Sequence, residues 1–223
     1  GYSFIGWTTE SITVPTKTGY TFGGYYTGTN GSGTQYYFDD GTGVMRSDFE
    51  VATTLYAKWT VNTYTVTLNQ QSATTDGTKS VNVNYGSAMP SIALPKRTGY
   101  TCGGFYTSTS GSGTKYYNAN GSSARTYTLT SATTLYAYWT KDTYTITYNN
   151  NGGTINTTPT TSYQYGNSVT LPDDVTRDGC TFGGWFDNAN CEGGAVTTIP
   201  SSSTGNKTFY AKWTPNTYAV RLH

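Results

Sequence analysis

The side chains that most often perform catalysis or bind metals are scarce in this sequence. Its single histidine is His223, at the very end, so a Ser-His-Asp or Cys-His catalytic arrangement would have to be built on a chain terminus. A zinc site made of histidines and cysteines lacks ligands. We therefore expect no catalytic residues, no metal site and no cofactor.

Acidic residues are few, and the adjacent pairs are Asp39-Asp40 and Asp173-Asp174. Glycoside hydrolysis needs two carboxylates. However, Asp39-Asp40 aligns with Asn118-Ala119 or Tyr117-Asn118 in a related stretch of the chain, where no carboxylate stands. The carboxylates at 39–40 are therefore interpreted as turn residues.

Three cysteines leave one question open. Cys180 and Cys191 lie in one segment that a hairpin could fold back on itself, so they could form a disulfide. The sequence does not supply the Cα separation that such a bridge requires. Cys102 stands where related segments carry phenylalanine, so we expect a small buried side chain there.

Aromatic residues make up 16% of the chain, and several occur in consecutive pairs such as Tyr25-Tyr26 and Trp185-Phe186. Neighbouring residues of a strand point to opposite faces, so one member of each pair should face outward. An outward aromatic row could stack on sugar rings or contact a partner protein, and it could equally be buried between adjacent modules. The candidate ligand-binding residues are Tyr26, Tyr37, Tyr106, Tyr117 and Phe186.

Charge and composition narrow the class of protein. The chain of 223 residues has a formal net charge of +1 and only 11% charged residues. It has no basic excess to hold a phosphate backbone, so we expect no nucleic-acid partner. Its abundant Thr, Tyr, Val and Trp favour strands. No run of about 18 apolar residues occurs, so we expect no membrane insertion within this segment.

The sequence contains three copies of one pattern. An aromatic block with a Gly-Gly pair occurs at 19–26, and a closing block that ends in tryptophan occurs at 55–59. The aromatic block recurs at 99–106 and 179–186, and the closing block recurs at 135–139 and 209–213. The third copy is shorter between its two blocks.

These blocks define the domain organisation that we expect. Residues 1–60 form repeat 1, which lacks its N-terminal part, residues 61–140 form repeat 2, and residues 141–214 form repeat 3. Residues 215–223 are interpreted as the start of a further repeat or a tail. We therefore expect the chain to be a piece of a longer array.

Repeat 2 illustrates the local pattern. Apolar residues alternate with threonine over 64–68, which predicts a strand with one buried face. A polar turn leads to a second predicted strand over 81–85, giving a hairpin. The Gly103-Gly104 pair in the aromatic block predicts a bulge or a close backbone approach. No segment has a helical period, so the expected fold class is β-rich, α+β at most.

The closing blocks predict both a core and a shape. Small modules with few aliphatic residues need large side chains to bury area, so we expect Trp59, Trp139 and Trp213 in the core. About four residues separate each closing block from the next strand, and four residues reach only about 13–14 Å. Consecutive modules therefore cannot rotate freely, and we expect an elongated array in which each module contacts its neighbours.

The order of these blocks resembles that of the Listeria–Bacteroides repeat, the B-repeat type of internalins. The matching pattern is Tyr-Gly, Leu-Pro, Arg or Lys-x-Gly-Tyr-Thr-Phe-x-Gly and Leu-Tyr-Ala-Lys-Trp, and it covers essentially the whole chain. Residues 149–154 are similar to the family's Asn-Gly-Gly-Thr turn, whereas Cys102 and Cys180 replace aromatic residues. The resemblance implies β-grasp-like modules in secreted or surface-anchored bacterial proteins, used as spacers and sometimes in receptor contact.

Composition and resemblance together predict a non-catalytic tandem-repeat spacer or stalk of a bacterial cell-surface or secreted adhesin, which presents a distal binding domain. The alternative hypothesis is a module that binds carbohydrate or a host glycoprotein through outward-facing aromatics. In both cases we expect an extracellular location at the bacterial surface. We also expect a monomer, with a host glycan or a surface protein as the candidate partner.

Overall fold

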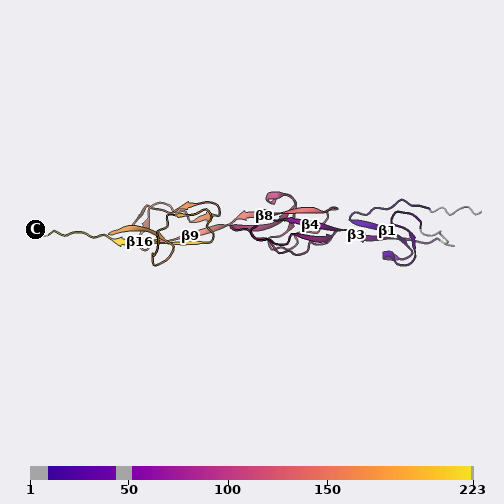
Figure 1. Ribbon diagram of the computed structural model, residues 1–223, viewed down its shortest axis with the longest axis horizontal. Coiled ribbons are helices and arrows are strands. Elements are labelled where there is room, and N and C mark those ends of the chain that lie inside the picture. The colour runs from indigo at the N-terminus through magenta and orange to yellow at the C-terminus, as the bar shows by residue number, and fades with distance from the viewer. Residues whose placement is uncertain (1–9, 44–51, 222–223) are drawn as a thin grey trace, which may run out of the picture. The chain divides into compact units, whose positions relative to one another are not determined.

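The computed structural model describes residues 10–43 and 52–221 (Figure 1). Within these ranges the helical elements are two short 3-10 turns, η1 (Thr29–Gly31) and η2 (Thr109–Gly111), and the other regular elements are strands. The β-rich fold class is therefore confirmed, while the relation to a β-grasp stays a prediction. No helix in the described part is long and apolar enough to cross a membrane.

The strands are short and follow the repeats. In chain order they are β1 (Tyr20–Tyr26), β2 (Gln35–Tyr37), β3 (Tyr56–Val61), β4 (Thr63–Asn69), β5 (Ser80–Asn84), β6 (Tyr100–Tyr106), β7 (Lys115–Tyr117), β8 (Thr133–Lys141), β9 (Thr143–Asn149), β10 (Thr154–Ile155), β11 (Ser162–Gln164), β12 (Val169–Thr170), β13 (Val175–Thr176), β14 (Cys180–Phe186), β15 (Thr198–Ile199) and β16 (Lys207–Pro215).

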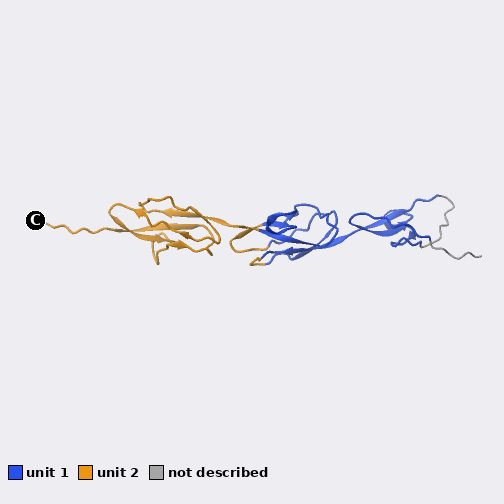
Figure 2. Cartoon of the chain, turned by 90° about the horizontal axis from the view of Figure 1, so that it is seen from above, with its two compact units in different colours: residues 1–71, 76–94, 103–138 blue, residues 72–75, 95–102, 139–223 orange. Residues whose placement is uncertain are grey.

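The chain divides into two compact units, drawn in blue and orange in Figure 2. Unit 1 holds repeat 1 and most of repeat 2, and unit 2 holds repeat 3 with three short stretches of repeat 2, the last being residues 139–140. Unit 1 comprises residues 1–71, 76–94 and 103–138, and unit 2 comprises residues 72–75, 95–102 and 139–223.

Repeats 2 and 3 share one sheet order. It is β5-β4-β8-β6-β7 in repeat 2 and β11-β9-β16-β14 in repeat 3. The opening strand (β4 or β9) lies parallel to the closing strand (β8 or β16), and the hairpin partner (β5 or β11) runs antiparallel to the opening strand. Repeat 1 contributes a three-stranded sheet, β2-β1-β3, in which β3 is the closing strand.

Side-chain alternation explains which face of the opening strand packs against the core. Val66 and Leu68 of β4 are 0% and 3% exposed, whereas the threonines beside them are exposed. Successive side chains of a strand point to opposite faces, so the apolar residues face the core. Leu68 lies opposite Leu135 of β8, which is also fully buried. Each such burial stabilises the fold by about 1.5–3 kcal/mol.

The Gly-Gly pair of each aromatic block makes the predicted irregularity. The register of β1 against β3 shifts between Phe22 and Tyr25, an interval that holds the two glycines, and β14 shifts against β16 at the equivalent place. In β6, Gly104 has a φ of +113°, and a methyl group there would collide with the carbonyl oxygen of Tyr117. The bulge is therefore confirmed in repeats 1 and 3, and the close backbone approach in repeat 2.

Each unit buries its own apolar side chains. In unit 1 the largest fully buried ones include Phe105, Tyr116, Tyr117 and Tyr127, and the rings of Tyr116 and Tyr127 lie 5.8 Å apart. In unit 2 the buried cluster consists of Ile146, Tyr163, Leu171, Val175, Trp185, Ile199, Phe209 and Ala211. Aromatic residues supply much of both cores because the sequence has few aliphatic residues.

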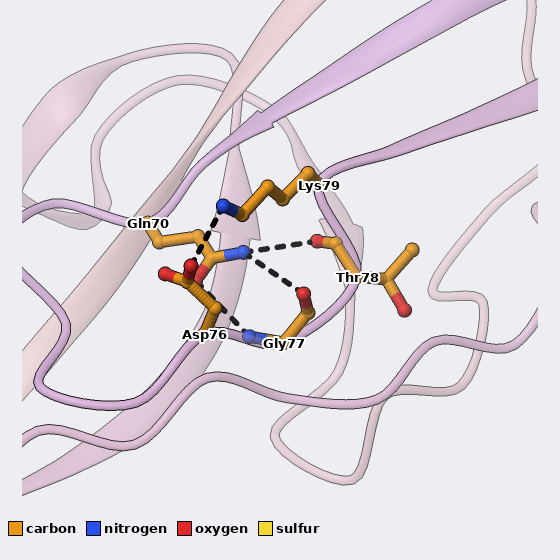
Figure 3. A network of polar contacts seen from close by, with 5 residues as sticks. All are labelled: Gln70, Asp76, Gly77, Thr78 and Lys79. Carbon is orange, nitrogen blue, oxygen red and sulfur yellow. Dashed lines mark hydrogen bonds and ion pairs between the residues drawn. The ribbon is translucent and has the colours of Figure 1, made fainter.

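A side-chain amide holds the turn between β4 and β5 (Figure 3). Gln70 Nε2 donates hydrogen bonds to the carbonyl oxygens of Gly77 and Thr78, each at 3.2 Å, and the Gly77 amide donates to Gln70 Oε1 at 3.1 Å. Lys79 Nζ lies 2.7 Å from the Asp76 carboxylate, but both side chains are mostly exposed, so this ion pair adds little stability. These contacts close the hairpin that the sequence predicts.

Candidate functional site: aromatic faces and repeat joints

A lysine of the closing strand lies over an aromatic ring of the aromatic block in repeats 1 and 3. Lys58 Nζ is 5.7 Å from the ring centre of Tyr26, and Lys212 Nζ is 5.0 Å from that of Phe186. Cations within about 6 Å of a ring centre are attracted to its face. The lysine stem also crosses Gly23, where an added methyl group would lie 3.2 Å from Lys58 Cδ. The repeat itself therefore covers part of these rings.

Repeat 2 carries a tyrosine in place of that lysine. The ring of Tyr138 lies 5.9 Å from that of Tyr106, at an angle of 81°, and Lys115 Nζ lies 5.6 Å from the Tyr106 ring. An edge-to-face pair of this kind is favourable. Both tyrosines are half-buried, so repeat 2 presents part of two neighbouring aromatic rings to solvent.

The prediction of outward-facing rings is wrong for two of the five candidate residues. Phe186 is 4% exposed and Tyr117 is 0% exposed. Trp185, beside Phe186, is also buried, so both faces of that strand are covered. Tyr117 donates its hydroxyl hydrogen bond to the carbonyl oxygen of Pro90 at 2.9 Å, and burial raises its pKa to about 12. The same cause raises the pKa of Tyr148.

The other three candidates, Tyr26, Tyr37 and Tyr106, are half-buried. Tyr37 packs edge-on against Tyr25, with ring centres 6.3 Å apart. The Tyr26 hydroxyl donates to the carbonyl oxygen of Gly23 at 3.3 Å. These rings have structural contacts within their own repeats, and each leaves part of its surface accessible. Their role as ligand-binding residues therefore stays a hypothesis.

The closing tryptophans pack at the edge of the core, as Trp213 does against the buried cluster of unit 2, and their predicted core role stays a prediction. Trp59, Trp139 and Trp213 are half-buried. Trp213 lies at the edge of the cluster, where its Nε1 donates to the carbonyl oxygen of Asn150 at 2.8 Å. Among the tryptophans that the structure describes, the fully enclosed one is Trp185, at 2% exposure. The half-buried Tyr25 follows the same bulge in repeat 1, so the Gly-Gly pair alone does not identify the buried position.

Cys180 and Cys191 are both free, so the disulfide that the sequence left open is not formed. Cys180 lies opposite Pro215 of β16, whereas Cys191 Sγ lies 3.9 Å from the carbonyl oxygen of Ala211. Pro215 and Ala211 are four residues apart in β16, which corresponds to about 13 Å along the strand. The two cysteines therefore lie at places along β16 that a disulfide does not span. Cys102 is 8% exposed, which confirms the prediction of a small buried side chain.

The carboxylate pair at 39–40 belongs to a turn, as predicted. Asp40 Oδ1 accepts hydrogen bonds from the amide and the hydroxyl of Thr42, at 2.8 and 2.6 Å, and these bonds lower the pKa of Asp40. Asn120 Oδ1 accepts the same two bonds from Ser122 in repeat 2. An amide thus replaces the carboxylate without changing the turn, so the charge of Asp40 is not required there.

The residue after each closing strand makes the same two hydrogen bonds to the aromatic block of its repeat, and we call this contact a joint. In the first joint, the backbone N–H of Asn62 donates to the carbonyl oxygen of Gly19 at 2.9 Å, and Thr21 Oγ1 donates to Asn62 Oδ1 at 2.6 Å. The same pair of bonds links Asp142 to Gly99 and Thr101, and Asn216 to Gly179 and Thr181. The backbone carbonyl oxygen of Asn62 also accepts a hydrogen bond from the backbone N–H of Tyr85, and that of Asp142 accepts one from the backbone N–H of Tyr165. The sequence predicted short links between the repeats at these positions, but it did not predict their hydrogen bonds.

A tyrosine ring closes two of these joints. Gly19 is buried, and a methyl group there would collide with the ring of Tyr85 in unit 1. Gly99 is buried beneath the ring of Tyr165 in unit 2 in the same way. Both glycines have positive φ angles, which disfavours any other residue independently of the ring. The joint is therefore a specific contact rather than a loose tether.

Sites for small ligands or metals are poorly developed. One hollow in unit 2 is an open groove of about 450 Å³, lined mainly by hydroxyl and amide side chains such as Ser162, Gln164 and Asn167. Within residues 10–43 and 52–221, no group of three His, Cys, Asp or Glu could hold a metal ion.

The aromatic blocks lie within matches to a known module. The family model described as the Listeria-Bacteroides repeat domain matches the chain three times, over residues 10–58, 64–138 and 144–212. The chain belongs to this repeat family. Each Listeria-Bacteroides repeat match contains the glycines of the bulge and the first part of a closing strand, whereas the joint residues Asn62, Asp142 and Asn216 lie outside the matches.

Relatives with these repeats are much longer proteins. The chain is 30% identical over 205 residues to a putative Gly-rich membrane protein of Evansella cellulosilytica, covering 92% of this chain and 22% of that protein. It is 36% identical over 130 residues to Internalin H of Listeria monocytogenes, covering 58% of this chain and 21% of the internalin. The chain thus spans about a fifth of each. No solved structure matches it.

Proposed function

We propose that the chain is a non-catalytic spacer in a bacterial cell-surface or secreted adhesin, where it presents a distal binding domain. The observation that carries the proposal is the joint, which occurs three times with the same two hydrogen bonds. A joint that fixes backbone, side chain and, in two cases, a tyrosine ring limits bending between repeats. A spacer needs this property, because a freely bending chain does not hold its tip away from a surface.

The names of the relatives support the location. Two are called membrane proteins and one is an internalin. A place at the bacterial surface, outside the cell, accords with these names and with a chain of low charge that is soluble without attracting polyanions. The absence of a shared catalytic constellation in the three repeats accords with a structural role.

A second function, binding of carbohydrate or a host glycoprotein, is favoured by one observation. Tyr106 and Tyr138 place two half-buried rings side by side in repeat 2, with Lys115 next to them. Tyrosine rings with an accessible face can stack on sugar rings, and a lysine can donate hydrogen bonds to their hydroxyls. Tyr26 offers one such ring in repeat 1.

A glycan-array screen separates the two functions. The spacer predicts no binding to any glycan by the intact chain. The binding module predicts signals that disappear in a Tyr26→Ala, Tyr106→Ala double variant and persist in a Tyr56→Ala control, which changes an exposed tyrosine outside the aromatic blocks. Selective loss in the double variant would overturn the assignment as a spacer alone.

A further inference from the structure

Strand β5 forms one edge of the five-stranded sheet of repeat 2, and within residues 10–43 and 52–221 no strand pairs with its outer side. On its inner side it pairs antiparallel with β4, where Asn82 lies opposite Thr65. The equivalent strand of repeat 3, β11, also lies at the edge of its sheet. The edge position of this strand therefore belongs to the topology of the repeat.

A hydrogen bond beside β5 shows which of its backbone groups point outward. The backbone N–H of Leu68 donates to the carbonyl oxygen of Lys79, just before the strand, at 2.8 Å. Hydrogen-bonded pairs alternate with non-bonded pairs along an antiparallel ladder. The odd-numbered residues of β5 therefore bond to β4, whereas the backbone N–H and C=O groups of Ser80, Asn82 and Asn84 point away from it.

The edge formed by β5 lacks the features that usually protect an edge strand. Native edges are kept from pairing by short length, lysine, proline or a bulge. The other edge of the repeat 2 sheet, β7, has three residues, begins with Lys115 and shifts its register against β6. In repeat 3, β11 has three residues and β14 carries the Gly-Gly bulge. Strand β5 has five residues without charge, proline or register shift.

The sequence of β5 matches itself when two copies run antiparallel. It is Ser-Val-Asn-Val-Asn, which reads nearly the same in both directions. Two such strands centred on Asn82 place Val81 of each copy opposite Val83 of the other, and Ser80 opposite Asn84. The outward N–H and C=O groups of Asn82 then meet those of Asn82 in the second copy. Pairing also covers Val81, which is half-buried in the single chain.

Charge does not oppose this pairing. Lys79 lies just before β5, 2.7 Å from the Asp76 carboxylate (Figure 3). When a two-fold axis passes beside Asn82, the Lys79 side chains of the two copies lie at opposite ends of the strand pair. Like charges therefore do not meet, and the uncharged edge fits a second uncharged edge.

We propose that the outer edge of β5 pairs antiparallel with β5 of a second copy of this chain, about a two-fold axis beside Asn82. The sheet of repeat 2 then continues from one copy into the other. The contact is isologous, because the same residues take part on both sides, so it closes on a dimer and does not propagate. The proposal goes beyond the spacer function, since it joins two spacers side by side, and it replaces the expectation of a monomer.

Light scattering coupled to size-exclusion chromatography tests the proposal on the intact chain. The weight-average mass should rise with concentration from 24.1 kDa toward twice that value and no further. Asn82→Pro should hold the mass at the monomer value, because proline lacks the N–H that the second copy needs. Proline is tolerated where the N–H of an edge strand faces solvent, so the variant should keep its circular dichroism. Asn82→Thr keeps the N–H and should still form the dimer.

A second variant acts through a side chain and leaves the backbone of β5 unchanged. Val81→Lys places a charge at the edge position that faces Val83 of the second copy, and it should also give a monomer. Its matched control is Thr161→Lys, the equivalent change in repeat 3, which should leave the dimer intact.

Hydrogen exchange followed by mass spectrometry locates the contact. Peptides that cover residues 80–84 should exchange more slowly as the concentration rises, while peptides that cover residues 162–164 should not change. Three results would overturn the proposal: a monomer at every concentration, a mass that rises beyond the dimer, or dimers of Val81→Lys and folded Asn82→Pro chains as stable as those of their controls.

Discussion

Among the tryptophans in residues 10–43 and 52–221, replacement of Trp185 by alanine should be the most damaging single substitution. Trp185 is 2% exposed, and its ring lies 5.1 Å from that of Tyr148 and 5.5 Å from that of Phe182. Its Nε1 donates a hydrogen bond to the carbonyl oxygen of Pro172 at 2.7 Å. The substitution empties this enclosed site and removes the donor of that bond.

The size of the effect follows from that burial. Emptying the site of a large aromatic residue in a core costs about 3–5 kcal/mol. Stability of about 0.05–0.15 kcal/mol per residue gives a repeat of roughly 70 residues about 4–10 kcal/mol in total. Trp185→Ala should therefore remove a third or more of the free energy of unfolding of repeat 3. Trp213→Ala should cost less, because Trp213 is half-buried.

Urea unfolding followed by hydrogen exchange and mass spectrometry measures this difference repeat by repeat. Peptides from 141–214 should lose protection at lower urea in the Trp185→Ala chain, while peptides around Leu135 in repeat 2 keep theirs. The reasoning fails if Trp213→Ala destabilises repeat 3 as much as Trp185→Ala does, or if Trp185→Ala costs less than about 1 kcal/mol.

Three further predictions concern the joints, the tyrosines and the thiols. In urea unfolding, Gly99→Ala should lower the free energy of unfolding by about 1–3 kcal/mol more than Gly179→Ala. Both glycines have a positive φ, but only Gly99 lies beneath a ring, that of Tyr165. Equal losses would refute the buried joint. In spectrophotometric titration, Tyr117 should stay protonated up to about pH 12, because burial raises its pKa in the folded state. Its contribution to the free energy of unfolding should be lost as the pH rises from about 10 to 12. Full ionisation of all tyrosines near pH 10 in the folded chain would contradict the burial of Tyr117. Thiol titration of the unfolded, unreduced chain should count three free cysteines, and a count of one would mean that Cys180 and Cys191 are paired.

The repeated pattern allowed much of the fold to be predicted. The alternation of threonine with apolar residues located the opening strand β4, and the Gly-Gly pair located the bulge. Apolar residues at every second position indicate that one face of a strand is buried, but they do not show whether other segments cover the opposite face. Tyr117 and Phe186 were therefore predicted to face outward, although loop and side-chain contacts from elsewhere in their repeats bury them.

The candidate sites were harder to predict because they depend on contacts between separate segments. Trp185 is enclosed by contacts with Tyr148 and with the carbonyl oxygen of Pro172, both outside its own strand. The joint residues Asn62 and Asp142 were visible as a repeated feature. Their hydrogen bonds to Gly19 and Gly99 join positions far apart in the sequence, and no local pattern reveals such pairs.

The central claim, that the repeats act as a spacer, is tested most directly by small-angle X-ray scattering extrapolated to infinite dilution. A compact globule of this length would have a radius of gyration of about 17 Å. Repeats connected by rigid joints predict a value well above this, with a distance distribution that has a long tail. A value near 17 Å with a symmetric distribution would mean that the repeats gather around one another, and it would contradict the spacer.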